Sequence, residues 1–340
     1  MSDRYSRQEL FAGIGKSGQE KLASKHVLII GAGALGTGNA EILTRAGIGK
    51  LTIVDRDYVE WSNLQRQQLF SEEDAGNRLP KAIAAKKRLR AINCDIDIRA
   101  FIMDVGIQEI EELSAGVDLI IDATDNFDVR LLINDLSQKK KIPWIYGACV
   151  GSYGLSYTIF PGKTPCLSCL LETVPLGGAT CDTAGIIAPA VQMVVAHQTS
   201  EALKLLVEDM DALRNKLVSF DLWKNQYVTM NVDRMKKDDC PSCGVNPTHP
   251  FLQPENQMKT AVLCGRNTVQ IRPPKRSERN LDELASKLSK LGGALQQNPY
   301  LVSYTVDDTR RLVIFKDGRV LVHGTKDIHE AKSLYHRYVG

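Results

Sequence analysis

A short apolar run that ends in a glycine-rich turn limits the fold of this chain more than any other feature. Residues 26–30, HVLII, run directly into Gly31-x-Gly33-x-x-Gly36, and a helical pattern follows. A second apolar run, LTIVD, ends at Asp55, about 20 residues further on. Strand, glycine turn, helix and a second strand with a terminal carboxylate follow one another in this order in nucleotide-binding βαβ units. The pattern predicts a nucleotide site at the carboxyl edge of a parallel sheet.

Further buried runs at 117–122 and 142–146 alternate with helical segments. This alternation predicts right-handed βαβ units and hence an α/β fold with a doubly wound, Rossmann-like, mostly parallel sheet. Residues 156–160 read as an extension of that sheet, and residues 189–208 as a long amphipathic helix that begins at a proline. Trp61 and Trp144 are expected in the core.

With 340 residues the chain has the length of about two domains. We expect an adenine-nucleotide or dinucleotide domain over residues 1–244, a proline- and asparagine-containing linker over 245–258, and a small α+β domain of βαβββα order over 259–340. The elements expected in the small domain are a strand at 260–272, a helix at 281–291, strands at 300–306, 311–316 and 319–323, and a helix at 326–337.

Charge and hydropathy exclude several classes of partner. Lys and Arg number 43 and Asp and Glu 40, a formal net charge of +3. Such a balance gives no electrostatic reason to expect nucleic acid or a membrane surface as the partner. No apolar run reaches 18 residues, and residues 1–7, MSDRYSR, hold no signal-peptide core. We therefore expect a cytoplasmic protein, in which the eight cysteines serve as metal ligands or reactive thiols more than as disulfides.

The glycine turn and Asp55 do not by themselves separate ATP from NAD(P). They leave open an NAD(P)-dependent oxidoreductase, and also a tight strand–helix turn that binds no nucleotide. The residues that follow Asp55 are what distinguish these cases, because an oxidoreductase has no evident need for Asn63 to Gln67, for Lys81 or for the turn at Asp125.

With these segments the sequence resembles the ThiF/MoeB family, bacterial relatives of the ubiquitin-activating enzymes. The resemblance covers residues 3–244 and rests on RYSRQ at 4–8, GAGALG at 31–36, DRD at 55–57, SNLQRQ at 62–67, PK at 80–81, ATDN at 123–126 and Cys181-x-x-x-Gly185. It implies an adenylyltransferase that uses ATP and Mg²⁺ to adenylate the C-terminal glycine of a ubiquitin-like sulfur carrier protein ending in Gly-Gly.

The same resemblance implies roles for individual residues. Arg66 and Lys81 would hold the phosphates, Asn63 the phosphates or the ribose, and Asp125 the Mg²⁺ ion, while Asp57 is a further carboxylate near the ribose. Arg7 would reach the phosphates of the neighbouring subunit, which makes a homodimer the expected active unit. Taken singly, each of these cations could also be an ordinary surface residue, and Asp125 could cap the following helix.

Two C-x₂-C pairs, Cys166/Cys169 and Cys240/Cys243, are typical of a closed tetrahedral zinc site. Such a site is structural, because it leaves no coordination position open. Redox-active C-x-x-C motifs and disulfides are the alternatives. Cys181 lies in a run of small residues and is a candidate nucleophile toward the acyl-adenylate, or else a packing thiol.

The carrier itself is left open. The resemblance and the extension after residue 244 favour a carrier for thiamine thiazole biosynthesis, and the molybdopterin synthase small subunit is the alternative. A scaffold that binds a carrier without adenylating it is a non-enzymatic alternative. For residues 259–340 the hypotheses are docking of the carrier or of a sulfur donor protein, stabilisation of a dimer, and simple scaffolding.

Overall fold

The computed structural model describes residues 3–171, 184–253, 260–262, 267–272 and 278–339. The chain divides into two compact units. The first comprises Met1–Gly76 and Pro80–Asn256, and the second comprises Asn77–Leu79 and Gln257–Gly340.

The strands of the first unit form a sheet of order β3-β2-β1-β4-β5-β6-β7-β8. The pairs from β3 to β5 are parallel, and those from β5 to β8 are antiparallel. This is the doubly wound α/β sheet expected from the sequence, with an antiparallel extension. The strands are β1 His26–Ile30, β2 Lys50–Asp55, β3 Asp97–Ile102, β4 Leu119–Asp122, β5 Trp144–Val150, β6 Tyr153–Ile159, β7 Leu217–Asp221 and β8 Gln226–Met230.

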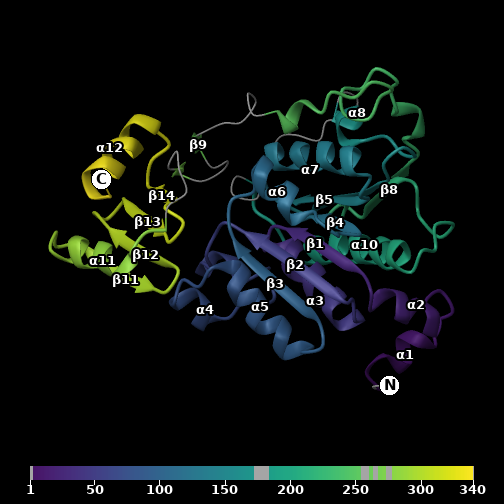
Figure 1. Cartoon of the computed structure of the whole chain (residues 1–340), viewed down its shortest axis with the longest axis horizontal. Coiled ribbons are helices and arrows are strands. Elements are labelled where there is room, and N and C mark those ends of the chain that lie inside the picture. The colour runs from purple at the N-terminus through teal and green to yellow at the C-terminus, as the bar shows by residue number, and fades with distance from the viewer. Residues whose placement is uncertain (1–2, 172–183, 254–259, 263–266, 273–277, 340) are drawn as a thin grey trace. The chain divides into compact units, whose positions relative to one another are not determined.

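Helices cover both faces of this sheet. Helices α6 and α7 lie on one face, and α3, α5 and α10 lie on the other (Figure 1). The α-helices of the first unit are α1 Ser6–Glu9, α2 Gly15–Leu22, α3 Ala34–Ala46, α4 Glu72–Gly76, α5 Lys81–Ile92, α6 Ile107–Leu113, α7 Phe127–Lys140, α8 Leu167–Leu171 and α10 Ala188–Leu206. Short 3₁₀ turns lie at η1 Asp3–Tyr5, η2 Trp61–Asn63, η3 Asp233–Met235 and η4 Pro250–Leu252.

Burial on both faces explains the unbroken apolar runs. Every residue of β1 is buried, and Ile29 lies in register with Ile53 on one side and Ile121 on the other. Parallel register brings the carboxyl ends of β1, β2 and β4 to one edge of the sheet. The turns that follow these strands are therefore neighbours, although they lie far apart in the sequence.

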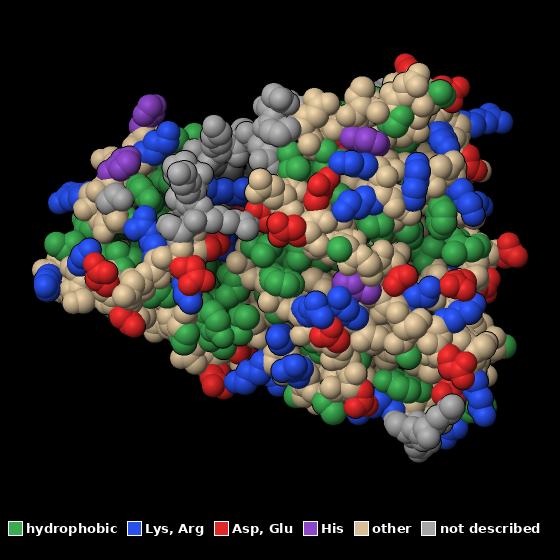
Figure 2. Space-filling view, viewed as in Figure 1, with side chains coloured by type: hydrophobic (Ala, Val, Ile, Leu, Met, Phe, Trp, Pro, Cys, Tyr) green, Lys and Arg blue, Asp and Glu red, His purple; other side chains and the backbone are tan. Residues whose placement is uncertain are grey.

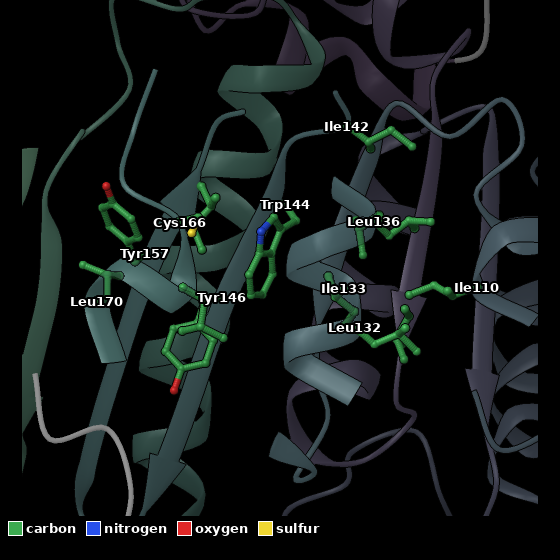
Figure 3. Close-up of a cluster of buried hydrophobic side chains, with 14 of the residues drawn as sticks. Ile110, Leu132, Ile133, Leu136, Ile142, Trp144, Tyr146, Tyr157, Cys166 and Leu170 are labelled. Atoms are coloured by element: carbon green, nitrogen blue, oxygen red, sulfur yellow. The ribbon is translucent and has the colours of Figure 1, made fainter. Parts of the chain in front are cut away.

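The core between the sheet and α7 is built from large side chains (Figure 3). Leu132, Ile133 and Leu136 of α7 lie beside the strand that carries Trp144 and Tyr146. Trp144 is fully buried as expected, with its ring edge toward Tyr146 at 6.1 Å between centroids. The expectation for the other tryptophan was wrong: Trp61 is 62% exposed, because it starts the turn η2 outside the sheet.

The second unit has its own six-stranded antiparallel sheet, of order β11-β12-β13-β14-β10-β9. Its elements are β9 Thr260–Val262, β10 Thr268–Ile271, α11 Leu281–Ser289, β11 Ala294–Asn298, β12 Leu301–Thr305, β13 Arg311–Phe315, β14 Val320–His323 and α12 Ile328–Tyr338. Two details differ from the sequence-based expectation. The single strand predicted at 260–272 is two paired strands, and β11 was not predicted, because its sequence ALQQN lacks an apolar pattern.

Helices α11 and α12 contribute Leu284, Leu288 and Ala331 to a separate hydrophobic core on the sheet of the second unit. Among the described helices of either unit, none is long and apolar enough to cross a membrane. On the face of the molecule in Figure 2, basic and acidic side chains are interspersed and form no large field of one sign, in keeping with the small net charge.

Candidate nucleotide site and four-cysteine cluster

The glycine turn packs against the neighbouring strand end so tightly that side chains are excluded. Gly31 has φ +102°, and a Cβ built on it would lie 2.4 Å from the carbonyl oxygen of Ala123. A Cβ on Gly36 would lie 1.9 Å from the carbonyl oxygen of Gly31. Gly33 differs, because the nearest atom to its Cβ position is Nε2 of Gln67 at 3.9 Å. Two glycines of the motif therefore serve packing, and the third leaves open space at the start of α3.

That open space lies at a helix N-terminus. Gly33 is the N-cap of α3 and has no side chain to cap it, and no described side chain accepts from the first-turn N–H groups. Backbone N–H groups and the helix dipole attract anions at such a position. The side chain of Gln67, 4% exposed, lies beside it, and its Oε1 accepts no hydrogen bond from the described residues. A buried amide with an unpaired oxygen next to the glycine turn fits a site that a nucleotide fills.

Asp55 ties the glycine turn to the end of β2. Its carboxylate accepts hydrogen bonds from the backbone N–H of Ala32 at 2.6 Å and of Asp57 at 2.7 Å. Burial raises the pKa of the Asp55 carboxyl, and the positive charge of Lys81 opposes this shift. Lys81 is the first residue of α5 and is 4% exposed, with Nζ 3.8 Å from Asp57 Oδ2. The structure thus brings together the glycine turn, both carboxylates and the candidate phosphate lysine.

Arg56 and Asp104 form a pair at this site to which the sequence pattern assigned no role. Nη1 of Arg56 lies 3.5 Å from Oδ1 of Asp104, and both side chains are largely buried. Burial opposes the charged form of Arg56, but the carboxylates of Asp104, Asp57 and Asp125 raise the pKa of the guanidinium above its ordinary value. A second cation therefore faces the carboxylates of this site. Its position within Asp55-Arg56-Asp57, directly after a strand, was the available signal.

Asn63 and Arg66 lie on the turn after β2. The Asn63 side chain is buried, and its Oδ1 accepts a hydrogen bond from the Glu60 N–H at 3.0 Å. Arg66 is half-buried and donates from Nη1 to the carbonyl oxygen of Ser62 at 2.7 Å. Among the described contacts, both side chains bond to their own turn, so they shape the segment that reaches from β2 to α4.

Asp125 lies in the turn that follows β4, and its side chain is exposed. It does not cap the next helix: Asn126 caps α7, with its Oδ1 accepting from the N–H groups of Asp128 and Val129. Its carboxylate influences the pKa of both Arg56 and Arg130. Asp125 therefore shares the carboxyl edge of the sheet with Arg56, and its charge is available to a ligand.

Arg7 lies elsewhere in the unit. It is exposed on α1, and residues on either side of it bond to the ends of α3 and α5, which lie opposite the glycine turn. Gln8 donates to the carbonyl oxygen of Ala46 at 2.8 Å, and Tyr5 accepts from Asn93 at 2.8 Å. The 13 residues of α3 span about 20 Å between the two ends of the helix. Among the described candidates for the nucleotide site, Arg7 is thus the one that lies far from the glycine turn of its own chain.

The four cysteines of the two C-x₂-C pairs form a single cluster. Their sulfur atoms all lie within 4.8 Å of one another. The individual separations are 3.8 Å for Cys166–Cys169, 3.6 Å for Cys166–Cys240 and 3.5 Å for Cys169–Cys243. Four sulfurs each about 2.3 Å from one tetrahedral ion lie about 3.8 Å apart. These three separations match this value, and the cluster could therefore hold a zinc ion.

Neighbouring polar groups orient the cluster. Ser168 and Ser242 are each the third residue of a C-x₂-C motif, and their hydroxyls hydrogen-bond to each other at 2.9 Å. Asn134 of α7 accepts from the N–H of Leu167 at 2.8 Å, which fixes the first pair against α7. Cys181, the candidate nucleophile, lies outside the described residues.

Comparison with known proteins gives a consistent result. The model of the ThiF family matches residues 5–242. Over its full length, and over the full length of its relative, the chain is 55% identical to the sulfur carrier protein ThiS adenylyltransferase of Bacillus subtilis. It is 36% identical to the ThiS adenylyltransferase of Escherichia coli, covering 73% of this chain and 97% of that protein. It is 35% identical to the molybdopterin-synthase adenylyltransferase of Salmonella typhimurium, covering 71% and 96%.

Solved structures share the fold of the first unit. Escherichia coli MccB, crystallised with ATP, aligns with a TM-score of 0.61 at 23% identity and covers 72% of this chain and 75% of that one. A further crystal structure of the same protein gives a TM-score of 0.63. The glycine turn, the Asp55-to-Gln67 segment, Lys81 and the Asp125 turn meet at one sheet edge within the matched region, and on these grounds the chain belongs to the ThiF family.

Proposed function

We propose that this protein uses ATP to adenylate the C-terminal glycine of a ubiquitin-like sulfur carrier protein of the ThiS type, for thiamine thiazole biosynthesis. The observation that carries the proposal is the set of groups at the carboxyl edge of the sheet: an anion-attracting helix N-terminus, the cations Lys81 and Arg56, and the carboxylates Asp55, Asp57 and Asp125. The full-length identity to a named ThiS adenylyltransferase supports the choice of carrier.

The reaction joins two anions, so its barrier is largely electrostatic. A carboxylate oxygen of the terminal glycine attacks the α-phosphorus of ATP, the bond to the bridging oxygen breaks, and pyrophosphate leaves with that electron pair. Charge develops on phosphoryl oxygens, where the N–H groups of α3, Lys81 and Arg66 would stabilise it. Asp55 and Asn63 would position the ribose and the turn. Mg²⁺ bound with ATP would neutralise phosphate charge, and Asp125 and Asp57 are the carboxylates that would hold it.

We propose a homodimer in which Arg7 completes the site of the partner subunit. The position of α1 at the far end of α3 supports this, because Arg7 cannot reach the glycine turn of its own chain across the length of α3. A cation supplied by the second subunit would add to Lys81 and Arg66 at the phosphates.

We further propose that Cys166, Cys169, Cys240 and Cys243 bind a structural zinc ion. We also propose that the reaction takes place in the cytoplasm. Cysteines paired as metal ligands rather than as disulfides are typical of a reducing compartment, which supports this location. For Cys181 we propose attack of the thiolate on the acyl-adenylate carbonyl, which forms a carrier thioester and releases AMP.

The test is exchange of labelled pyrophosphate into ATP with the purified chain, Mg²⁺ and two carriers, one of the thiazole type and one of the molybdopterin type. Each carrier is also supplied without its final glycine. Exchange that needs the intact thiazole-type carrier supports the proposal. Exchange with the molybdopterin-type carrier alone would reassign the pathway. ATP binding without exchange with either carrier would leave a scaffold, and binding of NAD(P) but not ATP would overturn the proposal.

A further inference from the structure

A buried ion pair lies directly beneath the turn that carries Asp125. Asp122, the last residue of β4, is fully buried, and its Oδ2 accepts from Nε of Arg130 at 2.9 Å. Its Oδ1 accepts two bonds from Thr124, from the backbone N–H and from the hydroxyl, each at 2.9 Å. One carboxylate therefore fixes both the start of the Asp125 turn and the second turn of α7.

Arg130 closes the turn from the other side. Its Nη2 donates to the carbonyl oxygen of Thr124 at 2.6 Å and to that of Gly147 at 3.3 Å. The guanidinium lies 5.1 Å from the ring centroid of Tyr146. A flat, branched cation can bond to a carboxylate and two carbonyl groups in different directions and still stack on an aromatic ring, whereas a lysine ammonium cannot. The site therefore requires arginine rather than positive charge alone.

The same turn touches the glycine motif. The carbonyl oxygen of Ala123 lies against Gly31, at 2.4 Å from the position a Cβ would take there. This packing holds the backbone at residue 123, whereas the bonds of Arg130 and of the Thr124 hydroxyl act on residue 124, directly before Asp125. The buried pair thus lies at a junction between two turns that would both contact the nucleotide.

We infer that Asp122, Thr124 and Arg130 are positioning residues that hold the Asp125 carboxylate in place for a divalent cation bound with nucleotide. This rests on the proposed function. Asp122 and Arg130 are buried, and their bonds to Thr124 act on Asp125 through the turn. Groups that orient a metal ligand typically change metal affinity by about 10- to 100-fold when removed. Removing one of these residues should therefore reduce, by a factor of this size, the increase in nucleotide affinity that the divalent cation provides.

The experiment measures binding of a non-hydrolysable ATP analogue to the full-length protein by calorimetry, once with Mg²⁺ and once with EDTA. Arg130→Lys keeps the charge beside Asp122 but loses the branched contacts. Thr124→Val keeps the shape of the side chain but loses the hydroxyl bond. The matched control is Arg99→Lys, since Arg99 forms an exposed ion pair with Asp97 on β3.

We expect both variants to bind the analogue in EDTA as the unmodified protein does, and to lose about 10- to 100-fold of the gain in affinity that Mg²⁺ provides. Arg99→Lys should keep that gain. A full gain in Thr124→Val, or in a folded Arg130→Lys protein, would overturn the inference, and so would an equal loss in EDTA and in Mg²⁺. If the unmodified protein shows no gain from Mg²⁺, the proposed function fails instead.

Discussion

The α-carbon of Gly36 packs directly on the carbonyl oxygen of Gly31, where a Cβ would lie 1.9 Å away. Gly33, between them in the same motif, faces open space. Substitution by alanine should therefore affect packing at Gly36 and ligand binding at Gly33.

Gly36→Ala should destabilise the protein by about 1 to 3 kcal/mol or more, since backbone must move to admit the methyl group. Gly33→Ala should leave the melting temperature unchanged but weaken ATP binding, because a methyl group there keeps phosphate from the N–H groups of α3. Thermal melts and ATP titrations of both variants check this. Equal melting temperatures would contradict the packing role of Gly36.

Cys240→Ser should remove zinc and lower stability by more than about 4 kcal/mol, because loss of a structural metal is among the most damaging single changes. Cys94→Ser is the matched control, since Cys94 is exposed and lies outside the cluster. Metal analysis and thermal melts measure both effects. A Cys240→Ser protein with one zinc per chain and an unchanged melt would refute the zinc assignment.

Asp125→Asn should lower pyrophosphate exchange by about 100- to 1,000-fold, as expected when a group aimed at the reacting phosphates is lost. The fold should survive, because Asp125 is exposed and makes no cap. Asp128→Asn, an exposed carboxylate three residues further on, is the control and should retain activity. Comparable rates for the two variants would remove Asp125 from the site.

A heterodimer tests whether Arg7 acts in trans. Co-expression of Arg7→Ala and Asp125→Asn chains with different tags, followed by two affinity steps, yields mixed dimers with one intact site in two. These should recover about half of the normal activity. Mixed dimers of Lys81→Met and Asp125→Asn are the control. Both of these residues belong to one chain's site, so that pairing should stay inactive. A mixed Arg7→Ala/Asp125→Asn dimer that is as inactive as this control would exclude the trans arrangement.

Stability should fall below about pH 6.5 because of His26, whose pKa is lowered by burial. Its ring nitrogens lie 3.0 Å from the Gly116 carbonyl oxygen and 2.9 Å from the Thr52 hydroxyl. The unfolded chain takes up a proton at a pH where the folded chain does not, so acidification favours unfolding by at most about 1.4 kcal/mol per pH unit.

Thermal melts between pH 7.5 and 5.5 measure this slope. His26→Gln should reduce it, and His329→Gln, at an exposed position on α12, should not. An unchanged slope in His26→Gln would assign the loss to other groups.

The parts of the site that could be predicted are those set by short-range pattern. The position of the glycine turn beside Asp55 follows from the ends of neighbouring parallel strands, so it could be predicted. The joining of the two C-x₂-C pairs in one cluster follows from their ligand spacing, so it could be predicted as well. Roles for Arg56 and Arg130 could not, because each depends on partners that only the packed sheet brings near. Arg7 illustrates the same limit. Its motif could be recognised in the sequence, but its position far from the glycine turn of its own chain could not be predicted.

In the second unit, β11 escaped prediction for a related reason. Its residues alternate too weakly in hydropathy to identify a strand, and pairing with β12 is what orders them. The prediction for Trp61 was wrong for a different reason. Its large apolar side chain suggested burial, but its place in a turn after β2 leaves it exposed.

The central position of β1 affects how the chain is made. Val27 pairs with Leu119, 92 positions further along the chain. At about 5 to 20 residues per second, a ribosome needs about 5 to 20 seconds to reach that partner. During this time the apolar strand HVLII has only β2 to pair with, and one of its edges stays open in the nascent chain. Newly made chains should therefore depend on chaperones until β4 has emerged, and slower translation before residue 119 should increase aggregation.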